Sequence, residues 1–222
     1  MNAIDYSLYM VTDAAAVYRR GLPAAVEAAV AGGVTVVQFR AEGVAKRELY
    51  ESGLVLRGLL RRLGVPLIVN DHVDLALALD ADGVHVGQGD LPAGVARRLL
   101  GREKILGLSA SNLEEVGAVD AAVVDYIGIG PVFPTQTKRD AAPAIGVEGL
   151  AALAARAPVP CVGIGGITIG RAAAVYAAGV AGIAVVSALS GADDVSAAAR
   201  ALRAARVLRA ARGKGQGAER EN

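Results

Sequence analysis

The chain has 222 residues, of which 23 are basic and 22 acidic, so its net charge of +1 gives no electrostatic support for binding nucleic acid or a membrane surface. The length suits one α/β domain with a full core, and no apolar run reaches the roughly 18 residues of a membrane-spanning helix. The N-terminal segment lacks the pattern of a signal peptide and the single cysteine, Cys161, cannot form an intramolecular disulfide, so we expect a cytoplasmic location.

Short runs rich in β-branched residues predict eight strands along the chain. They cover residues 7–11, 34–39, 66–70, 83–87, 104–109, 123–129, 159–164 and 182–187. Stretches rich in Ala and Leu with helical spacing lie between them, such as 44–63, and another covers 195–208 after the last strand. Strands that alternate with helices indicate βα units, and nearly continuous apolar strands are typical of a parallel sheet covered on both faces.

The length of the repeat predicts a compact (β/α)8 TIM barrel. The eight strands recur about every 25 residues, which is short for this fold but within its range. An open doubly wound sheet is the alternative, and the lack of a GxGxxG motif after the first strand weakens it. We expect residues 1–211 to form this single domain and the polar tail, residues 212–222, to be disordered because it has no apolar face.

Polar residues and glycines cluster at the C-terminal ends of the predicted strands, where a parallel barrel carries its active site. These positions are Gln38, Arg40, Asn70, Asp71, Gln88, Asp90, Ser109, Thr135, Gln136, Thr137, Lys138, Gly165, Gly166 and Ser187. Loops are polar in most proteins, but the segments IVND and IAVVS place polar groups directly on strand ends. We therefore expect these residues to converge on one site.

Asp71 and Asp90 follow neighbouring strands, and no histidine is placed to complete a catalytic triad with them. Two carboxylates among other oxygen ligands suit Mg²⁺, which commonly binds one or two carboxylates plus substrate phosphates. The alternative role for each is to cap a turn or a helix, because ND and GQGD are also good turn sequences. We expect His85 to be a hydrogen-bonded histidine of the core or rim rather than a base.

Two further features suit anionic ligands. Arg40 and Lys138 supply positive charge, and the glycines of GIGGI let backbone N–H groups approach a phosphate near the helix expected from Thr168. The segment around Val186 and Ser187 offers amides of the same kind. Together these features predict two anionic groups in the ligands, a metal-bound diphosphate and a separate monophosphate.

Six segments closely resemble the thiamine-phosphate synthases: VQFR, IVNDHVDLALALDADGVHVGQGDL, GLSAS, DYIGIGPVFPTQTK, GIGGI and GIAVVSAL. In that family a compact barrel joins a hydroxymethylpyrimidine diphosphate to a thiazole phosphate and releases pyrophosphate. The resemblance implies Mg²⁺ at Asp71 and Asp90, and small-molecule substrates as partners. It implies that the pyrimidine diphosphate is held by Gln38, Arg40, Asn70, Ser109 and Lys138. It assigns the thiazole phosphate to Thr135, Gln136, Thr137, Gly166, Val186 and Ser187.

Among these residues Lys138, Arg40 and Ser109 are the expected catalytic groups. The expected reaction is a dissociative substitution assisted by Mg²⁺, because an aminopyrimidine can share the positive charge that develops on its methylene carbon. Positive groups would then stabilise the departing diphosphate, and no general base is needed for bond formation.

The chain departs from the family at one position. The family usually reads Q-[LF]-R-x-K, whereas this chain reads Gln38-Phe39-Arg40-Ala41-Glu42, so Glu42 replaces the lysine. We expect this segment to contact the substrate, with Glu42 turned to solvent, paired with Lys46 or Arg47, or bound to a metal ion. The favoured arrangement moves Lys46 into the place of the missing lysine.

Two other functions stay open from the sequence. A thiazole tautomerase of the same superfamily would share the fold but would not need both metal carboxylates together with TQTK. A non-enzymatic regulatory protein on this barrel should have lost part of that set. The oligomeric state also stays open and includes a homo-oligomer.

Overall fold

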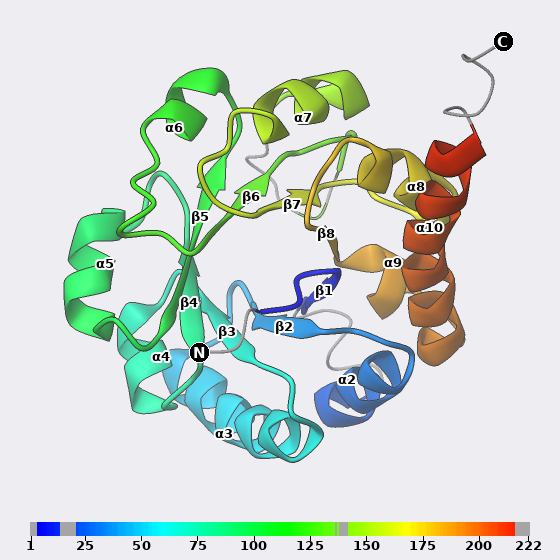
Figure 1. Cartoon of the computed structure of the whole chain (residues 1–222). Coiled ribbons are helices and arrows are strands. Elements are labelled where there is room, and N and C mark those ends of the chain that lie inside the picture. The colour runs from blue at the N-terminus through cyan, green and yellow to red at the C-terminus, as the bar shows by residue number, and fades with distance from the viewer. Residues whose placement is uncertain (1–3, 14–20, 136, 138–141, 216–222) are drawn as a thin grey trace, which may run out of the picture.

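Eight parallel strands close into a barrel in chain order (Figure 1). The computed structural model describes residues 4–13, 21–135, 137 and 142–215. The strands are β1 (Leu8–Val11), β2 (Val36–Phe39), β3 (Leu67–Asn70), β4 (Gly83–Val86), β5 (Ile105–Ala110), β6 (Tyr126–Ile129), β7 (Cys161–Ile164) and β8 (Gly182–Val185). The barrel closes where β8 pairs with β1. The predicted (β/α)8 barrel and all eight of its strands are therefore confirmed.

Helices surround the barrel on its outside (Figure 1). They are α2 (Leu22–Ala31), α3 (Lys46–Leu63), α4 (Val73–Ala78), α5 (Ala93–Leu100), α6 (Leu113–Gly117), α7 (Gly146–Ala154), α8 (Ile169–Ala177), α9 (Ser187–Ser190) and α10 (Val195–Gly215). The helix expected over 44–63 is confirmed by α3, whose Leu49, Leu56 and Leu60 are buried, but Leu63 of the same predicted face is exposed. Within the described part of the chain, no helix is both long and apolar enough to cross a bilayer.

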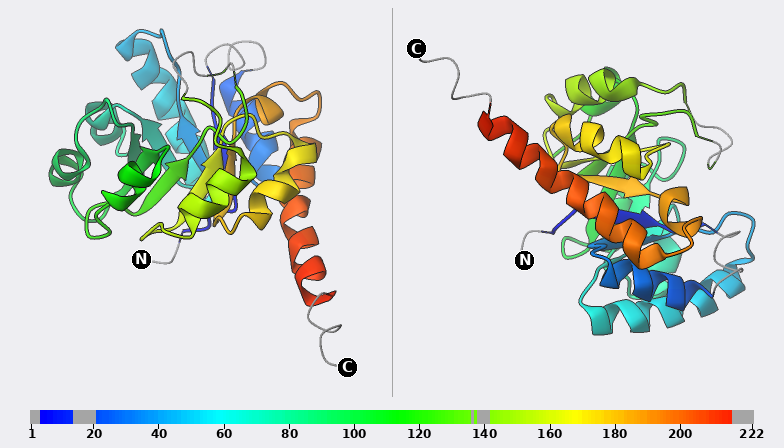
Figure 2. Two further views of the ribbon diagram at one scale, coloured as in Figure 1. Left: turned by 90° about the horizontal axis from the view of Figure 1, so that it is seen from above. Right: turned by 90° about the vertical axis from the view of Figure 1, so that its right-hand side faces the viewer.

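The last helix is longer than the sequence predicts. α10 continues through Gly215, past the expected end at Leu208, so residues 212–215 are helical and not part of a disordered tail. The sequence predicts an end at Leu208 because the apolar spacing stops there. Ala and Arg follow Leu208, and both are strong helix formers, so the helix continues. α10 packs against α8, α2 and α9, and Figure 2 shows its last turns extending beyond the barrel. Residues 216–222 lie outside the described residues.

Alternate residues of each strand divide between two packing layers, because side chains of a strand point to opposite faces. One layer fills the barrel interior and includes Tyr9, Val11, Val36, Ile68, Ile105, Tyr126, Val162 and Ala184. The other lies between the strands and the helices and includes Leu8, Met10, Val37, Phe39, Leu67, Val69, Val84, Val86, Leu106 and Ile127. Gln38 and Asn70 each follow an interior residue by two positions, so their side chains point to the barrel axis at the strand ends.

Carboxylates at the N-terminal ends of the strands connect neighbouring strands. Asp82 directly precedes β4 and accepts a hydrogen bond from the backbone N–H of Leu67 on β3 at 2.8 Å. Asp125 directly precedes β6 and accepts one from the N–H of Leu106 on β5 at 2.7 Å. These bonds satisfy backbone donors at the end of the barrel opposite to the expected site.

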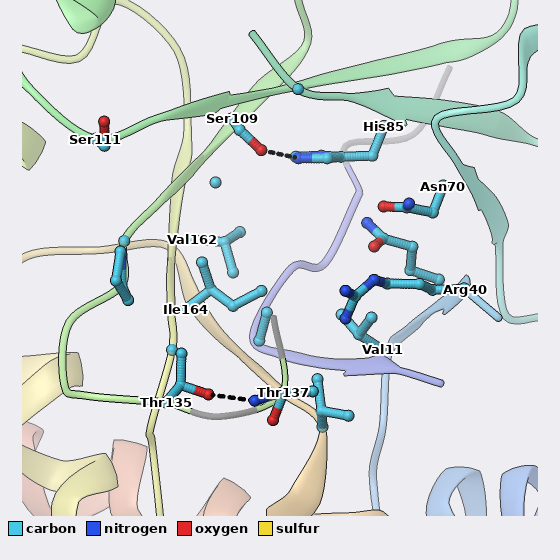
Figure 3. A pocket seen from close by; sticks show the side chains of 18 of the residues that line it. Val11, Arg40, Asn70, His85, Ser109, Ser111, Thr135, Thr137, Val162 and Ile164 are labelled. Atoms are coloured by element: carbon cyan, nitrogen blue, oxygen red, sulfur yellow. Dashed lines mark hydrogen bonds between the residues drawn. The ribbon is translucent and has the colours of Figure 1, made fainter. Parts of the chain in front are cut away.

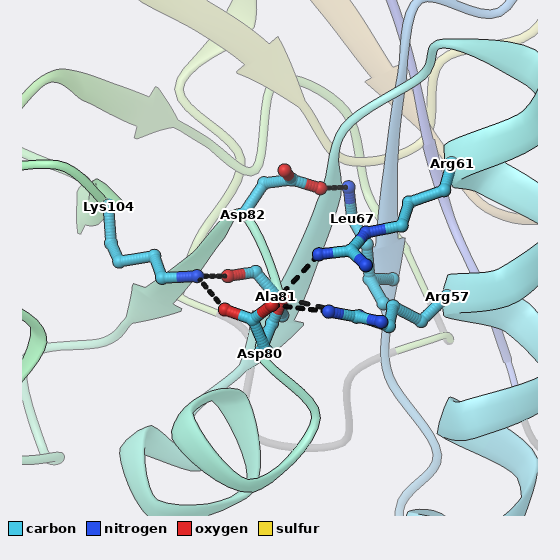
Figure 4. A network of polar contacts seen from close by, with 7 residues as sticks. All are labelled: Arg57, Arg61, Leu67, Asp80, Ala81, Asp82 and Lys104. Carbon is cyan, nitrogen blue, oxygen red and sulfur yellow. Dashed lines mark hydrogen bonds and ion pairs between the residues drawn. The ribbon is translucent and has the colours of Figure 1, made fainter.

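Asp80 gathers three basic side chains at this same end of the barrel (Figure 4). It accepts hydrogen bonds from Lys104 at 2.6 Å and Arg61 at 2.8 Å, and it also pairs with Arg57. The hydrogen bond and charge of Lys104, followed by the bond from Arg57, hold the pKa of the Asp80 carboxyl at about 2. Its backbone is left-handed, with a φ of 48°.

Asp80→Asn tests this charge cluster. Asparagine tolerates the left-handed backbone but carries no charge. Because the folded-state pKa lies below the ordinary value of 3.8, the ionised carboxylate stabilises the fold above that pH and loses its contribution as the pH falls toward 2. The wild type should melt at a higher temperature than the variant near neutral pH, and circular dichroism should show the gap closing below about pH 4. A gap that stays constant on acidification would contradict the assignment.

Candidate active site

A cavity of about 710 Å³ opens at the C-terminal ends of the strands. Figure 3 shows Arg40, Asn70 and Ser109 on one side of it and Thr135 and Thr137 on another. Most of the expected site residues line this cavity: Gln38, Arg40, Glu42, Asn70, Asp71, Gln88, Asp90, Ser109, Thr135, Thr137, Gly165, Gly166, Val186 and Ser187. Residues widely separated in the sequence therefore share one cavity.

Among the described residues of the expected set, Phe39 and Ala41 do not line the cavity. Phe39 alternates with Gln38 on β2, so its side chain packs between the strands and the helices. Ala41 packs against the same layer. The side chains of Phe39 and Ala41 therefore point away from the cavity, and a contact of this segment with substrate would have to come from its backbone. Gln136 and Lys138 lie outside the described residues.

The backbone of Arg40 is held by Thr12, a residue that has no functional signal in the sequence. The hydroxyl of Thr12, which follows β1, donates a hydrogen bond to the Arg40 carbonyl at 2.8 Å and accepts one from the Arg40 N–H at 2.9 Å. Thr12 is buried, and its own N–H donates to the Gln38 carbonyl at 2.9 Å. These bonds hold the end of β2 against the end of β1 and so place Arg40 at the cavity.

The guanidinium of Arg40 forms an ion pair with Glu42. Lys46 instead pairs with Asp74 on α4, so it does not take the place of the family's lysine, and the favoured expectation for Lys46 is wrong in this structure. Glu42 lines the cavity, but its charge is compensated by the cation closest to it in the sequence. Glu42 therefore pairs with the side chain that the sequence predicts to bind an anion.

The carboxylates of Asp71 and Asp90 border the same cavity. Asp71 has a left-handed backbone with a φ of 60°, a conformation that is uncommon outside glycine, and its N–H donates to the His85 carbonyl at 2.8 Å. Asp90 accepts a hydrogen bond from the Gly87 N–H at 2.7 Å through Oδ2. Asp90 therefore caps its turn, as the alternative interpretation expects, and also lines the cavity.

The donor set fits Mg²⁺ better than a metal that requires several protein ligands. In the described part of the chain, no group of three or more His, Cys, Asp or Glu side chains is placed to hold a metal ion. Asp71 and Asp90 would give a cation two carboxylates and leave its other positions to phosphate and water. Mg²⁺ is commonly bound in this way.

The loop after β6 is attached to the end of β7. The N–H of Val132 donates to the Ile164 carbonyl at 2.8 Å, and the N–H of Phe133 donates to the Gly165 carbonyl at 3.0 Å. Gly166 has a φ of 61°, and a β-carbon there would lie 2.7 Å from the carbonyl oxygen of Pro134. Only glycine fits this close approach. Thr135 and Thr137, which follow Pro134, therefore lie on the same part of the cavity as Gly166.

Five side chains form a hydrogen-bonded relay at the cavity. In order they are Gln38, Tyr9, Tyr126, His85 and Ser109, with successive distances of 3.0, 2.8, 2.9 and 3.0 Å. The expectation that His85 is a hydrogen-bonded histidine is confirmed. Tyr9 and Tyr126 were not expected in the site, because the strand-end criterion does not reach residues nearer the strand starts. Their signal in the sequence is the two-residue alternation that places them on the inner face.

Known proteins share both the sequence and the fold. Residues 8–189 match the family described as thiamine monophosphate synthase. The chain is 55% identical to the thiamine-phosphate synthase of Chloroflexus aurantiacus over 193 residues, which cover 87% of this chain and 89% of that protein. It is 50% identical to the thiamine-phosphate synthase of Syntrophomonas wolfei over 190 residues, 86% of this chain and 91% of that one.

A solved structure agrees with these relatives. The thiamine phosphate pyrophosphorylase of Pyrococcus furiosus matches with a TM-score of 0.83 and 38% identity, over 92% of this chain and 97% of that chain. The matched region contains the whole barrel from β1 to β8 and every described residue that lines the cavity. The chain therefore belongs to the thiamine monophosphate synthase family.

Proposed function

We propose that the protein joins 4-amino-2-methyl-5-(diphosphooxymethyl)pyrimidine to a thiazole phosphate, giving thiamine phosphate and pyrophosphate. The observation that carries this proposal is one cavity lined by two sets of groups. One set suits a metal-bound diphosphate, and the other suits a monophosphate. Its volume of about 710 Å³ lies within the usual range for small-molecule sites. The single cysteine fits a cytoplasmic reaction, which we include in the proposal.

The first set suits the diphosphate and comprises Arg40, Asn70, Asp71 and Asp90. Bound Mg²⁺, held by Asp71 and Asp90, would neutralise charge on the leaving diphosphate. Arg40 would contact the diphosphate through two parallel hydrogen bonds, which its planar guanidinium allows. From the family resemblance we add Lys138 to this set as a second cation.

The second set suits the monophosphate of the thiazole and comprises Thr135, Thr137, Gly166, Val186 and Ser187. Figure 3 shows the apolar side chains of Val162 and Ile164 above Thr135 and across the cavity from Arg40. A phosphate held at the second set would leave the thiazole ring to pack against this apolar surface, with its nitrogen directed to the methylene carbon of the pyrimidine. Fixing both partners in this way removes much of the entropic cost of their reaction.

The two acidic residues give a direct test of this function. The purified protein, given both substrates and Mg²⁺, should form thiamine phosphate and pyrophosphate in equal amounts. Asp71→Asn and Asp90→Asn should each lower the rate at least about tenfold and raise the Mg²⁺ concentration needed for half-maximal rate, because each removes a charge that attracts the cation. Asparagine at position 90 still offers an oxygen to the Gly87 N–H, so the turn should persist.

Asp74→Asn is the matched control for this test. Asp74 is an exposed carboxylate on α4 that pairs with Lys46 and does not line the main cavity. Its replacement should leave the rate and the Mg²⁺ dependence unchanged. The function would be wrong if the wild type made no product, and the metal site would be wrong if all three variants kept the same Mg²⁺ dependence.

The ion pair of Arg40 and Glu42 predicts an effect on diphosphate affinity. Pyrophosphate must displace Glu42 from Arg40, and exposed ion pairs contribute up to about 1 kcal/mol. Glu42→Gln should therefore tighten pyrophosphate binding about two- to fivefold in isothermal titration calorimetry with Mg²⁺ present. Glu51→Gln, on the exposed surface of α3, should have no effect. Unchanged or weaker binding by Glu42→Gln would show that Glu42 does not compete with the diphosphate.

A further inference from the structure

The four hydrogen bonds that join Gln38, Tyr9, Tyr126, His85 and Ser109 are satisfied together by one order of hydrogens when the Gln38 amide is the donor. Gln38 Nε2 donates to the Tyr9 hydroxyl, so the single hydrogen of Tyr9 is left for the Tyr126 hydroxyl. Tyr126 accepts that hydrogen bond and gives its own hydrogen to His85 Nδ1. Burial raises the pKa of both tyrosines, so each keeps its hydrogen. In the opposite order, the Tyr9 hydroxyl would point its hydrogen at the Gln38 amide N–H. Both groups are donors, so neither would have an acceptor.

This order determines the tautomer of His85. Because Nδ1 accepts from Tyr126, the ring hydrogen of the neutral imidazole lies on Nε2, which donates to Ser109 Oγ at 3.0 Å. Ser109 Oγ is then an acceptor toward His85, and its own hydrogen remains for a different partner. Ser109 lines the cavity, where a bound ligand can accept that hydrogen.

We infer that Tyr9, Tyr126 and His85 are positioning residues that make the Ser109 hydroxyl a hydrogen-bond donor to the substrate. The atom that Ser109 recognises is therefore a hydrogen-bond acceptor, an oxygen or a ring nitrogen. Its assignment to the pyrimidine diphosphate rests on the proposed function, because Ser109 shares its side of the cavity with Arg40 and Asn70 (Figure 3). The order of hydrogens does not depend on that function.

The packing of the barrel is adapted to this relay. A β-carbon at Gly107 on β5 would lie 2.3 Å from Cζ of Tyr126 and 2.4 Å from Nδ1 of His85, so any side chain there would separate the two partners. A β-carbon at Gly128 on β6 would lie 3.2 Å from Cε1 of His85. The Tyr126 and His85 rings thus meet over two glycines, with centroids 5.4 Å apart. The fold leaves this space for the hydrogen bond between them.

The first test measures the tautomer in the ligand-free full-length protein. Nitrogen NMR on protein labelled with ¹⁵N-histidine should show, near neutral pH, an unprotonated Nδ1 and a protonated Nε2 for His85. The chain has two histidines, so a His72→Gln variant assigns the signals. A hydrogen on Nδ1, in the neutral or the charged ring, would overturn the inference. This result stands whether or not the protein makes thiamine phosphate, so it is independent of the proposed function.

The second test breaks the relay. Tyr126→Phe keeps the ring and removes the hydroxyl, which should shift the His85 nitrogen signals and lower kcat/KM for the pyrimidine diphosphate about tenfold, the scale of one lost hydrogen bond. The KM for the thiazole phosphate should not change. In a Ser109→Ala background the same substitution should have almost no further effect, because the relay acts through Ser109.

Tyr176→Phe is the matched control for this test. Tyr176 is equally buried and its hydroxyl donates to the Ser7 carbonyl at 2.7 Å, but it does not line the cavity. It should change stability and leave both the His85 signals and the kinetics as in the wild type. Equal effects of Tyr126→Phe and Tyr176→Phe, or equal effects of Tyr126→Phe with and without Ser109, would overturn the inference. Tyr9→Phe breaks the relay one step earlier and serves if Tyr126→Phe does not fold.

Discussion

The site depends on the two-residue alternation of side chains along eight parallel strands that close into a barrel. Closure brings every C-terminal strand end to one opening, and alternation decides which residues of each strand face it. Gln38, Asn70, His85 and Ser109 all occupy inner positions. A shift of β2 by one residue would replace Gln38 with Phe39 inside the barrel and would remove the first donor of the relay. Strand register is thus a requirement of the chemistry as well as of packing.

Charged and neutral polar groups occupy different parts of the cavity. Arg40, Asp71, Asp90 and Glu42 follow the strands, whereas Tyr9, Tyr126 and His85 lie on the strands themselves. Charged groups keep access to water in this arrangement, and the buried groups satisfy one another by hydrogen bonds, which lowers the cost of their burial. The pairing of Arg40 with Glu42 also reduces the net charge at the opening in the absence of ligand.

The sequence was sufficient to predict the barrel and the residues at its strand ends, because β-branched runs mark strands and because strand ends in a parallel barrel share one location. It failed where tertiary context decides. The motif alone does not show that the Phe39 side chain packs between the strands and the helices while its neighbours Gln38 and Arg40 line the cavity. Lys46 was expected near the diphosphate, but Asp74 from another helix pairs with it. Tyr9 lies in none of the family's segments, and Tyr126 lies in DYIGIGPVFPTQTK without a polar strand-end position, so only their place on the inner face reveals their part in the site.

A structure of the protein with thiamine phosphate, pyrophosphate and Mg²⁺ bound tests the central claim, which is that one cavity separates a diphosphate from a monophosphate. The account predicts the single phosphate of thiamine phosphate against Gly166 and Ser187, and pyrophosphate with its metal between Arg40 and the carboxylates of Asp71 and Asp90. Pyrophosphate bound at Gly166, or the phosphate of thiamine phosphate bound beside Arg40, would contradict it.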